Sequence, residues 1–190
     1  MRVWHARDNM LEFGQIYEID CLLTPEELEQ TAKEFEKCNW LFKAGETWMR
    51  DTYPVRTFWQ KPLESSEYIT SLFKTKIETL LGTGIEISRI YGNGQAHGQS
   101  AWVHTDDGRN DGGLYASLVY YLTPNWKPYY GGHLIFVDSV DEPAEVLKSI
   151  FPKSNSAVMF NSMMPHMALE PTVYCLTQRE SIAVKFKVLQ

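Results

Sequence analysis

Cysteine, positive charge and long hydrophobic segments are all scarce in this sequence of 190 residues. The three cysteines, Cys21, Cys38 and Cys175, form no C-x-x-C pair and are odd in number, which argues against a disulfide framework and favours reduced thiols. The formal net charge of -6, with dispersed lysine and arginine, argues against a nucleic acid partner. No segment approaches the roughly 18 apolar residues that span a bilayer, and the N-terminus is too polar for a signal peptide. We therefore expect a cytoplasmic protein with no membrane partner.

The composition is that of a globular domain, because 44% of the residues are hydrophobic and the length suits one core. We expect a single domain over residues 1–190. Thr24, Pro25 and Glu27 form a capping-box pattern that predicts a helix over residues 25–38. An apolar stripe that ends before Gly82 predicts a second helix over 66–81, and residues 40–60 have the composition of strands.

After Gly84 the sequence changes to short β-type runs separated by glycine, proline, asparagine and aspartate: IEISRIY, AWVH, YASLVYYL, GHLIFV, AVMF and SIAVKFKV. Such a series predicts an antiparallel sandwich or jelly roll over 85–190, supported by helices and strands of residues 1–84. The fold class is therefore α+β. Within the run YGNGQAHG, Asn93-Gly94 predicts a hairpin turn, and the glycine spacing does not fit a dinucleotide-binding loop.

The stretch AWVHTDDG places metal-binding side chains at the end of a predicted strand. On a strand, residues i and i+2 share a face, so His104 and Asp106 project together and form half of a metal site. Among the other histidines, His166 is the best third ligand, because it follows the AVMF run in an apolar neighbourhood. The structural alternative for His166 is a core histidine bonded to a backbone carbonyl.

Arg179 stands at the entrance of the last predicted strand, SIAVKFKV, where its guanidinium requires a planar anion. A bound dicarboxylate would provide that anion. A salt bridge to Glu170 or Glu180 is the alternative.

In this order and spacing, the residues resemble the Fe(II)- and 2-oxoglutarate-dependent oxygenases, and among them the prolyl 4-hydroxylase branch. The resemblance covers Ile85 to the C-terminus and includes RIYGNGQAHGQSAWVHTDD, LVYYLTPNW, YYGGHLIFV and RESIAVKF. It implies that His104, Asp106 and His166 bind Fe(II), and that Arg179 binds the distal carboxylate of 2-oxoglutarate. It also places four residues around that cosubstrate, two hydrogen-bonding tyrosines and two apolar walls: Tyr91, Tyr121, Leu134 and Val119.

Two departures from the branch affect these assignments. The interval from His166 to Arg179 is longer than usual, which predicts an enlarged loop. Lys185 is a competitor for the carboxylate, since some members of the family use lysine. The apolar alternation of the last strand places Lys185 on the face opposite Ile182, Val184 and Phe186, but Arg179 has the same parity. A bulge near Glu180 or Ser181 would separate the two residues.

The resemblance implies a dioxygenase that hydroxylates a prolyl residue in a protein or peptide and releases succinate and carbon dioxide, with ascorbate as a candidate reductant. Because Asp106 is retained, we expect hydroxylation and not halogenation. We expect Trp102, Met159, Phe160 and Met164 to keep water from the metal. The expected substrate-binding residues lie in aromatic and polar loops: Arg109, Trp126, Tyr129, Arg56 and Trp59. The alternatives are the same chemistry on a small molecule, or a non-catalytic jelly-roll module that binds a sugar or a structural metal.

Overall fold

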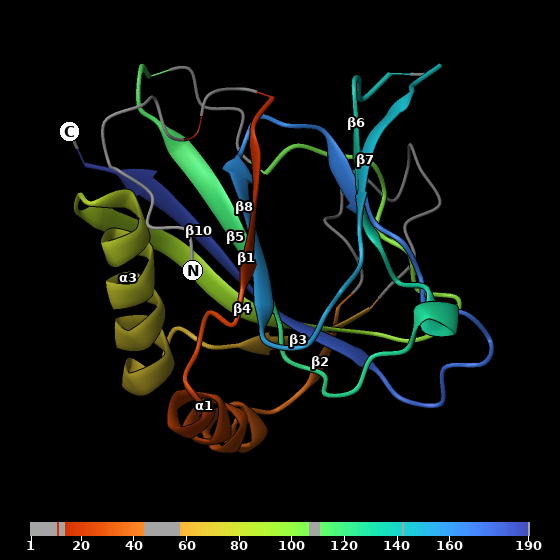
Figure 1. Ribbon diagram of the computed structural model, residues 1–190, viewed down its shortest axis with the longest axis horizontal. Helices are drawn as coiled ribbons and strands as arrows, with labels where there is room; N and C mark the ends of the chain where they lie inside the picture. The colour runs from red at the N-terminus through yellow and green to blue at the C-terminus, as the bar shows by residue number, and fades with distance from the viewer. Residues whose placement is uncertain (1–10, 12–13, 44–57, 107–110, 142, 190) are drawn as a thin grey trace.

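The computed structural model describes residues 11, 14–43, 58–106, 111–141 and 143–189, and it folds into two antiparallel sheets with two α-helices (Figure 1). The larger sheet has seven strands, in the order β1 (Ile16–Asp20), β8 (Ser156–Asn161), β5 (Tyr115–Tyr121), β10 (Arg179–Val188), β4 (Ile85–Gln95), β3 (Phe58–Pro62) and β2 (Leu41–Lys43). The smaller sheet has the order β7 (Val146–Ile150), β6 (Leu134–Val137) and β9 (His166–Ala168). The predicted α+β class is confirmed.

Both predicted helices form where the sequence places them. Helix α1 (Pro25–Lys37) begins with the predicted capping box, in which the Thr24 hydroxyl accepts from the Glu27 amide and the Glu27 carboxylate accepts from the Thr24 amide. Helix α3 (Glu67–Leu81) begins after Ser66 and ends at Gly82, which adopts the left-handed conformation with φ of 68°. A short 3-10 helix, η1, covers Pro128–Tyr130. No described helix is long and apolar enough to cross a membrane.

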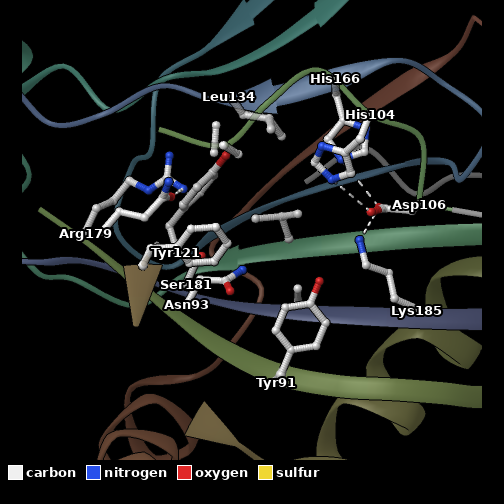
Figure 2. A pocket seen from close by; sticks show the side chains of 16 residues that line it. Tyr91, Asn93, His104, Asp106, Tyr121, Leu134, His166, Arg179, Ser181 and Lys185 are labelled. Carbon is white, nitrogen blue, oxygen red and sulfur yellow. Dashed lines mark hydrogen bonds and ion pairs between the residues drawn. The ribbon is translucent and has the colours of Figure 1, made fainter. Parts of the chain in front are cut away.

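The large sheet has a hydrophobic core on each face, as the period-two alternation of β5 requires. Leu118 and Tyr120 face the helices, where the Tyr120 ring lies 5.3 Å from the ring of Phe73 in α3. Val119 and Tyr121 face the smaller sheet and belong to a second core, in which rings from the two sheets also meet. The candidate site lies between the two sheets, beside this second core (Figure 2).

The predicted hairpin turn at Asn93-Gly94 is wrong, because both residues lie inside the 11-residue strand β4. The glycines instead permit close packing from the helical side. A Cβ atom at Gly92 would lie 2.4 Å from the ring of Phe35, and one at Gly94 would lie 2.7 Å from the ring of Trp40. Glycine is required here for the approach of neighbouring rings and not for a turn.

The expected strands of residues 40–60 are present as β2 and β3, and residues 44–57 lie outside the described part of the chain. The expected strand AWVH does not form. Residues 101–104 are irregular and make a single bridge, between His104 and His166.

Candidate metal centre and adjoining pocket

Three side chains from two distant segments meet at one end of a pocket (Figure 2). One ligand atom from each of His104, Asp106 and His166 lies within 4.8 Å of the other two. The Nε2 atoms of both histidines lie 3.5 Å from an oxygen of the Asp106 carboxylate. This is the spacing that one small cation bridging the three side chains would need.

Backbone hydrogen bonds bring the two histidines together although no regular strand carries His104. The amides of His104 and His166 donate to each other's carbonyl oxygens, both at 3.0 Å, so the two residues form a directly opposed pair. The Asp106 amide donates to the Ser162 carbonyl at 2.8 Å. The backbone therefore anchors His104 and Asp106 to the segment that carries His166.

The hydrogen bonds of the imidazoles leave the Nε2 atoms available to a metal. Nδ1 of His104 lies 2.7 Å from the Trp102 carbonyl oxygen, and Nδ1 of His166 lies 2.8 Å from that of Met164. A carbonyl oxygen accepts only, so Nδ1 carries the proton and donates. Burial, opposed in part by Asp106, lowers the pKa of His166 to about 4, which keeps this ring in the neutral form that binds metals.

The Asp106 side chain is held by two groups on its Oδ2 atom. The Ser117 hydroxyl donates to Oδ2 at 2.6 Å, and the Lys185 ammonium contacts the same oxygen. Burial alone would raise the pKa of Asp106, but Lys185 and the two imidazoles outweigh burial and lower this pKa well below its usual range. The carboxylate is therefore anionic and oriented, as a metal ligand must be.

The pocket that begins at these side chains is lined by every residue expected to contact the cosubstrate (Figure 2): Tyr91, Val119, Tyr121, Leu134 and Arg179. Arg179 forms the end opposite Asp106. Sequence reasoning missed several polar lining residues, namely Asn93, Gln95 and Ser181. Strand parity could have identified them, because they share a face with Tyr91 on β4 or with Arg179 on β10.

The Arg179 end of the pocket contains polar groups without partners. The guanidinium is 3% exposed, donates to the Gly132 carbonyl at 2.5 Å and contacts Gln95 Oε1. Within the described residues Arg179 makes no ion pair, so the alternative of a bridge to Glu170 or Glu180 is not observed. Its Nε atom, the Tyr121 hydroxyl and the Ser181 hydroxyl are all buried with no described partner. A carboxylate of a ligand fits this set of donors.

Lys185 lies on the face of β10 opposite the apolar residues, as the alternation predicts, and this face lines the pocket. The register of β10 against β4 is continuous from Arg179 to Lys185, and it shifts only between Lys185 and Phe186. No bulge near Glu180 or Ser181 separates Arg179 from Lys185 in this strand, so both cations line the pocket.

The expected substrate-binding residues are dispersed, and Arg109 and Arg56 lie outside the described residues. Trp126 is buried and its Nε1 donates to the Gly131 carbonyl at 3.0 Å, whereas Tyr129 is 57% exposed. Trp59 packs against Phe42, and its neighbour Phe58 is the residue of β3 that lines the pocket.

The residues expected to shield the metal divide into two groups. Met159, Phe160 and Met164 are buried, as expected. Trp102 is 41% exposed, and its shielding role stays a prediction.

Comparisons with known proteins agree with this geometry. A family described as the 2OG-Fe(II) oxygenase superfamily matches residues 87–186. Among solved structures, a prolyl hydroxylase from Trichoplax adhaerens in complex with a hypoxia-inducible factor peptide has a TM-score of 0.65 at 17% identity, with 90% of this chain and 83% of that chain covered.

Two further solved structures have the same fold. A Pseudomonas putida prolyl-4-hydroxylase has a TM-score of 0.63 at 17% identity, with 90% of this chain and 91% of that chain covered. HygX from Streptomyces hygroscopicus, with nickel, 2-oxoglutarate and hygromycin B bound, has a TM-score of 0.63 at 13% identity, with 90% and 82% covered. Curated proteins gave no match.

Proposed function

This chain belongs to the 2OG-Fe(II) oxygenase superfamily, and from that premise we propose that it is a dioxygenase that hydroxylates a prolyl residue in a protein or peptide. The observation that carries the proposal is the pairing of two complementary sites in one pocket. A group of two imidazoles and one carboxylate lies at one end, and a buried arginine with unpartnered donors lies at the other. A metal ion and the distal carboxylate of a chelating dicarboxylate fit these two ends.

In this proposal His104, Asp106 and His166 would hold Fe(II), and a set of only three protein ligands would leave coordination positions for 2-oxoglutarate and dioxygen. When bound, Fe(II) would supply the oxidising chemistry by which 2-oxoglutarate, dioxygen and a C–H group of the substrate are converted into succinate, carbon dioxide and a C–OH group. The backbone carbonyls of Trp102 and Met164 fix the two rings, and Ser117 and Lys185 fix the carboxylate.

The residues between the two ends would hold the cosubstrate and exclude water. Arg179 would pair with the distal carboxylate, and the hydroxyl groups of Tyr121 and Ser181 would donate to it. Burial raises the pKa of Tyr121 to about 12, so its hydroxyl keeps its proton at neutral pH and can donate. Val119 and Leu134 supply apolar walls, which strengthen these charge interactions by keeping water out.

The prolyl substrate rests on the resemblance to the prolyl 4-hydroxylase branch and on the likeness to two solved prolyl hydroxylases. HygX, which has a comparable fold similarity, is solved with hygromycin B bound, so a small-molecule substrate is the competing outcome of the test.

The experiment combines a spectroscopic step and a turnover step. Metal-free protein mixed anaerobically with Fe(II) and 2-oxoglutarate should develop the weak visible charge-transfer band of the chelate. On admission of air, proline-containing peptides should stimulate succinate release and gain the mass of one oxygen. Absence of the band would refute the oxygenase assignment, whereas turnover that only small molecules stimulate would refute the prolyl assignment alone.

A further inference from the structure

The metal end of the pocket contains a cation that contacts the proposed metal ligand Asp106 and is not needed to bind 2-oxoglutarate. Lys185 is six positions from Arg179 on β10, which separates their Cα atoms by about 20 Å at roughly 3.3 Å per residue. Its Nζ atom contacts Asp106 Oδ2 and lies 3.4 Å from the Ser117 hydroxyl, and its side chain is 15% exposed. An ammonium group has three donors, and the contacts with Asp106 and Ser117 occupy two of them.

A second cation lies beside Lys185 on the neighbouring strand. Arg89 of β4 is directly opposite Lys185 in the register, and it shares strand parity with the pocket residues Tyr91, Asn93 and Gln95. Its guanidinium lies 4.4 Å from the centre of the Tyr91 ring. Arg89 is exposed, and no carboxylate among the described residues pairs with it. Like charges that face each other across a strand pair are destabilising unless an anion lies between them.

The formal charges of the loaded pocket and of the residues beside it do not sum to zero. A divalent cation, Asp106, Arg179 and dianionic 2-oxoglutarate together have no net charge. Lys185 lines the pocket, and Arg89 lies opposite it on β4, exposed and outside the lining. These two cations therefore add positive charge at the edge of the metal end of the loaded pocket. Excess charge in a partly desolvated cleft attracts a ligand group of opposite sign.

We propose that the primary substrate carries a carboxylate that binds between Arg89 and Lys185. This inference rests on the proposed oxygenase function and narrows its substrate class. The Arg89 guanidinium can bind both carboxylate oxygens, and the remaining donor of Lys185 can reach one of them. Tyr91 orients the guanidinium through its ring face. The carboxylate is either an acidic side chain next to the target residue of a peptide or the free carboxylate of a small substrate.

The test uses protein loaded with Zn(II) and 2-oxoglutarate, because zinc has no redox chemistry and binding can be measured without turnover. The probes are two matched pairs, a capped Gly-Asp-Pro-Gly peptide with its Asn analogue, and free L-proline with L-prolinamide. We expect the acid of at least one pair to bind about tenfold tighter than its amide, the difference that one well-placed charge pair contributes. The pair that shows the difference identifies the source of the carboxylate.

Variants separate recognition from a merely structural role. Arg89→Gln should abolish the preference for the acid, and Arg89→Glu should reverse it in favour of a capped Gly-Lys-Pro-Gly peptide. Lys33→Gln, which removes an exposed lysine of α1, should leave the preference unchanged. If both acids bind no better than their amides, the inference is wrong. The anaerobic Fe(II) band reports separately on the oxygenase function, so a normal band with no charge preference would reject only the substrate class.

Discussion

Arg179 and Lys185 extend from the same face of β10 into one pocket, and they occupy its opposite ends (Figure 2). Arg179 contacts a backbone carbonyl and an amide oxygen, whereas Lys185 contacts the carboxylate of Asp106. The two cations therefore have different tasks, and substitution of each should affect a different ligand.

Arg179→Gln should weaken 2-oxoglutarate binding roughly 200- to 5,000-fold, because loss of one partner of a buried ion pair costs about 3–5 kcal/mol. The measurement is an anaerobic titration of 2-oxoglutarate into Fe(II)-loaded protein. Lys185→Met is the matched variant on the same strand and should change this affinity much less. An unchanged affinity in Arg179→Gln would reject its assignment to the distal carboxylate.

The contact between Lys185 and Asp106 should contribute to the stability of the metal-free protein. Their side chains are 15% and 5% exposed, so either single change, Lys185→Met or Asp106→Asn, leaves a largely buried charge without its partner. We expect each to lower the free energy of unfolding by about 3 kcal/mol. The double variant should lose at least about 1 kcal/mol less than the sum of the two. Urea unfolding in the presence of a chelator gives all three values, and additive losses would show that the pair is not coupled.

The sequence was sufficient to identify the helices from their short-range capping signals. It was also sufficient to nominate the candidate metal ligands from their residue types. The capping box at Thr24 and the glycine stop at Gly82 are short-range signals that the structure contains unchanged. The HxD pattern nominated His104 and Asp106 for the wrong local reason, since these residues are not on a regular strand. Their meeting with His166 depends on a backbone bridge between distant segments, which strand periodicity does not encode.

Tertiary packing explains the features that the sequence did not predict. Asn93-Gly94 has the composition of a hairpin turn, but the neighbouring rings of α1 and Trp40 require glycines inside a continuous strand. Lys185 alternates with apolar residues of β10, as the sequence indicates, and its own face of the strand lines the pocket. The apolar residues of β10 face the helix-side core. Because the sheet has an apolar core on each face, the alternation along the strand does not show which face carries the pocket.

The close approach of Phe35 to β4 predicts that Gly92→Ala is destabilising. The new Cβ atom would lie 2.4 Å from the ring, so the ring or the strand must move, at a cost of about 1–3 kcal/mol. Gly84→Ala is the control, since its Cβ atom would lie 3.4 Å from Leu189, and its free energy of unfolding should change by less than about 1 kcal/mol. Chemical unfolding of both variants tests the difference. Equal stabilities would contradict this packing.

Acidification should destabilise the metal-free protein through His166. Its pKa is about 4 in the folded protein, against an ordinary value of 6.5, because burial disfavours the charged ring. Between these values the unfolded chain binds the extra proton, so the free energy of unfolding falls as the pH decreases from about 6.5 to 4. The loss is of order 3 kcal/mol over this interval. In His166→Gln the pH dependence should be correspondingly shallower in urea unfolding with a chelator. An identical slope in both proteins would contradict the low pKa.

Binding of a divalent cation should stabilise the folded chain, because the three ligand atoms are brought together only on folding. A cation such as Co(II) at about 100 times its Kd should add about 3 kcal/mol to the free energy of unfolding. Asp106→Ala and His104→Ala should each remove this increment. His97→Ala is the control, because His97 is exposed and bonds to the Pro171 carbonyl instead of the metal centre. The measurement is the thermal or urea transition with and without cation. If the increment persists in Asp106→Ala or disappears in His97→Ala, the metal centre must be assigned elsewhere. Each result would place the bound ion away from the side chains that converge beside the pocket.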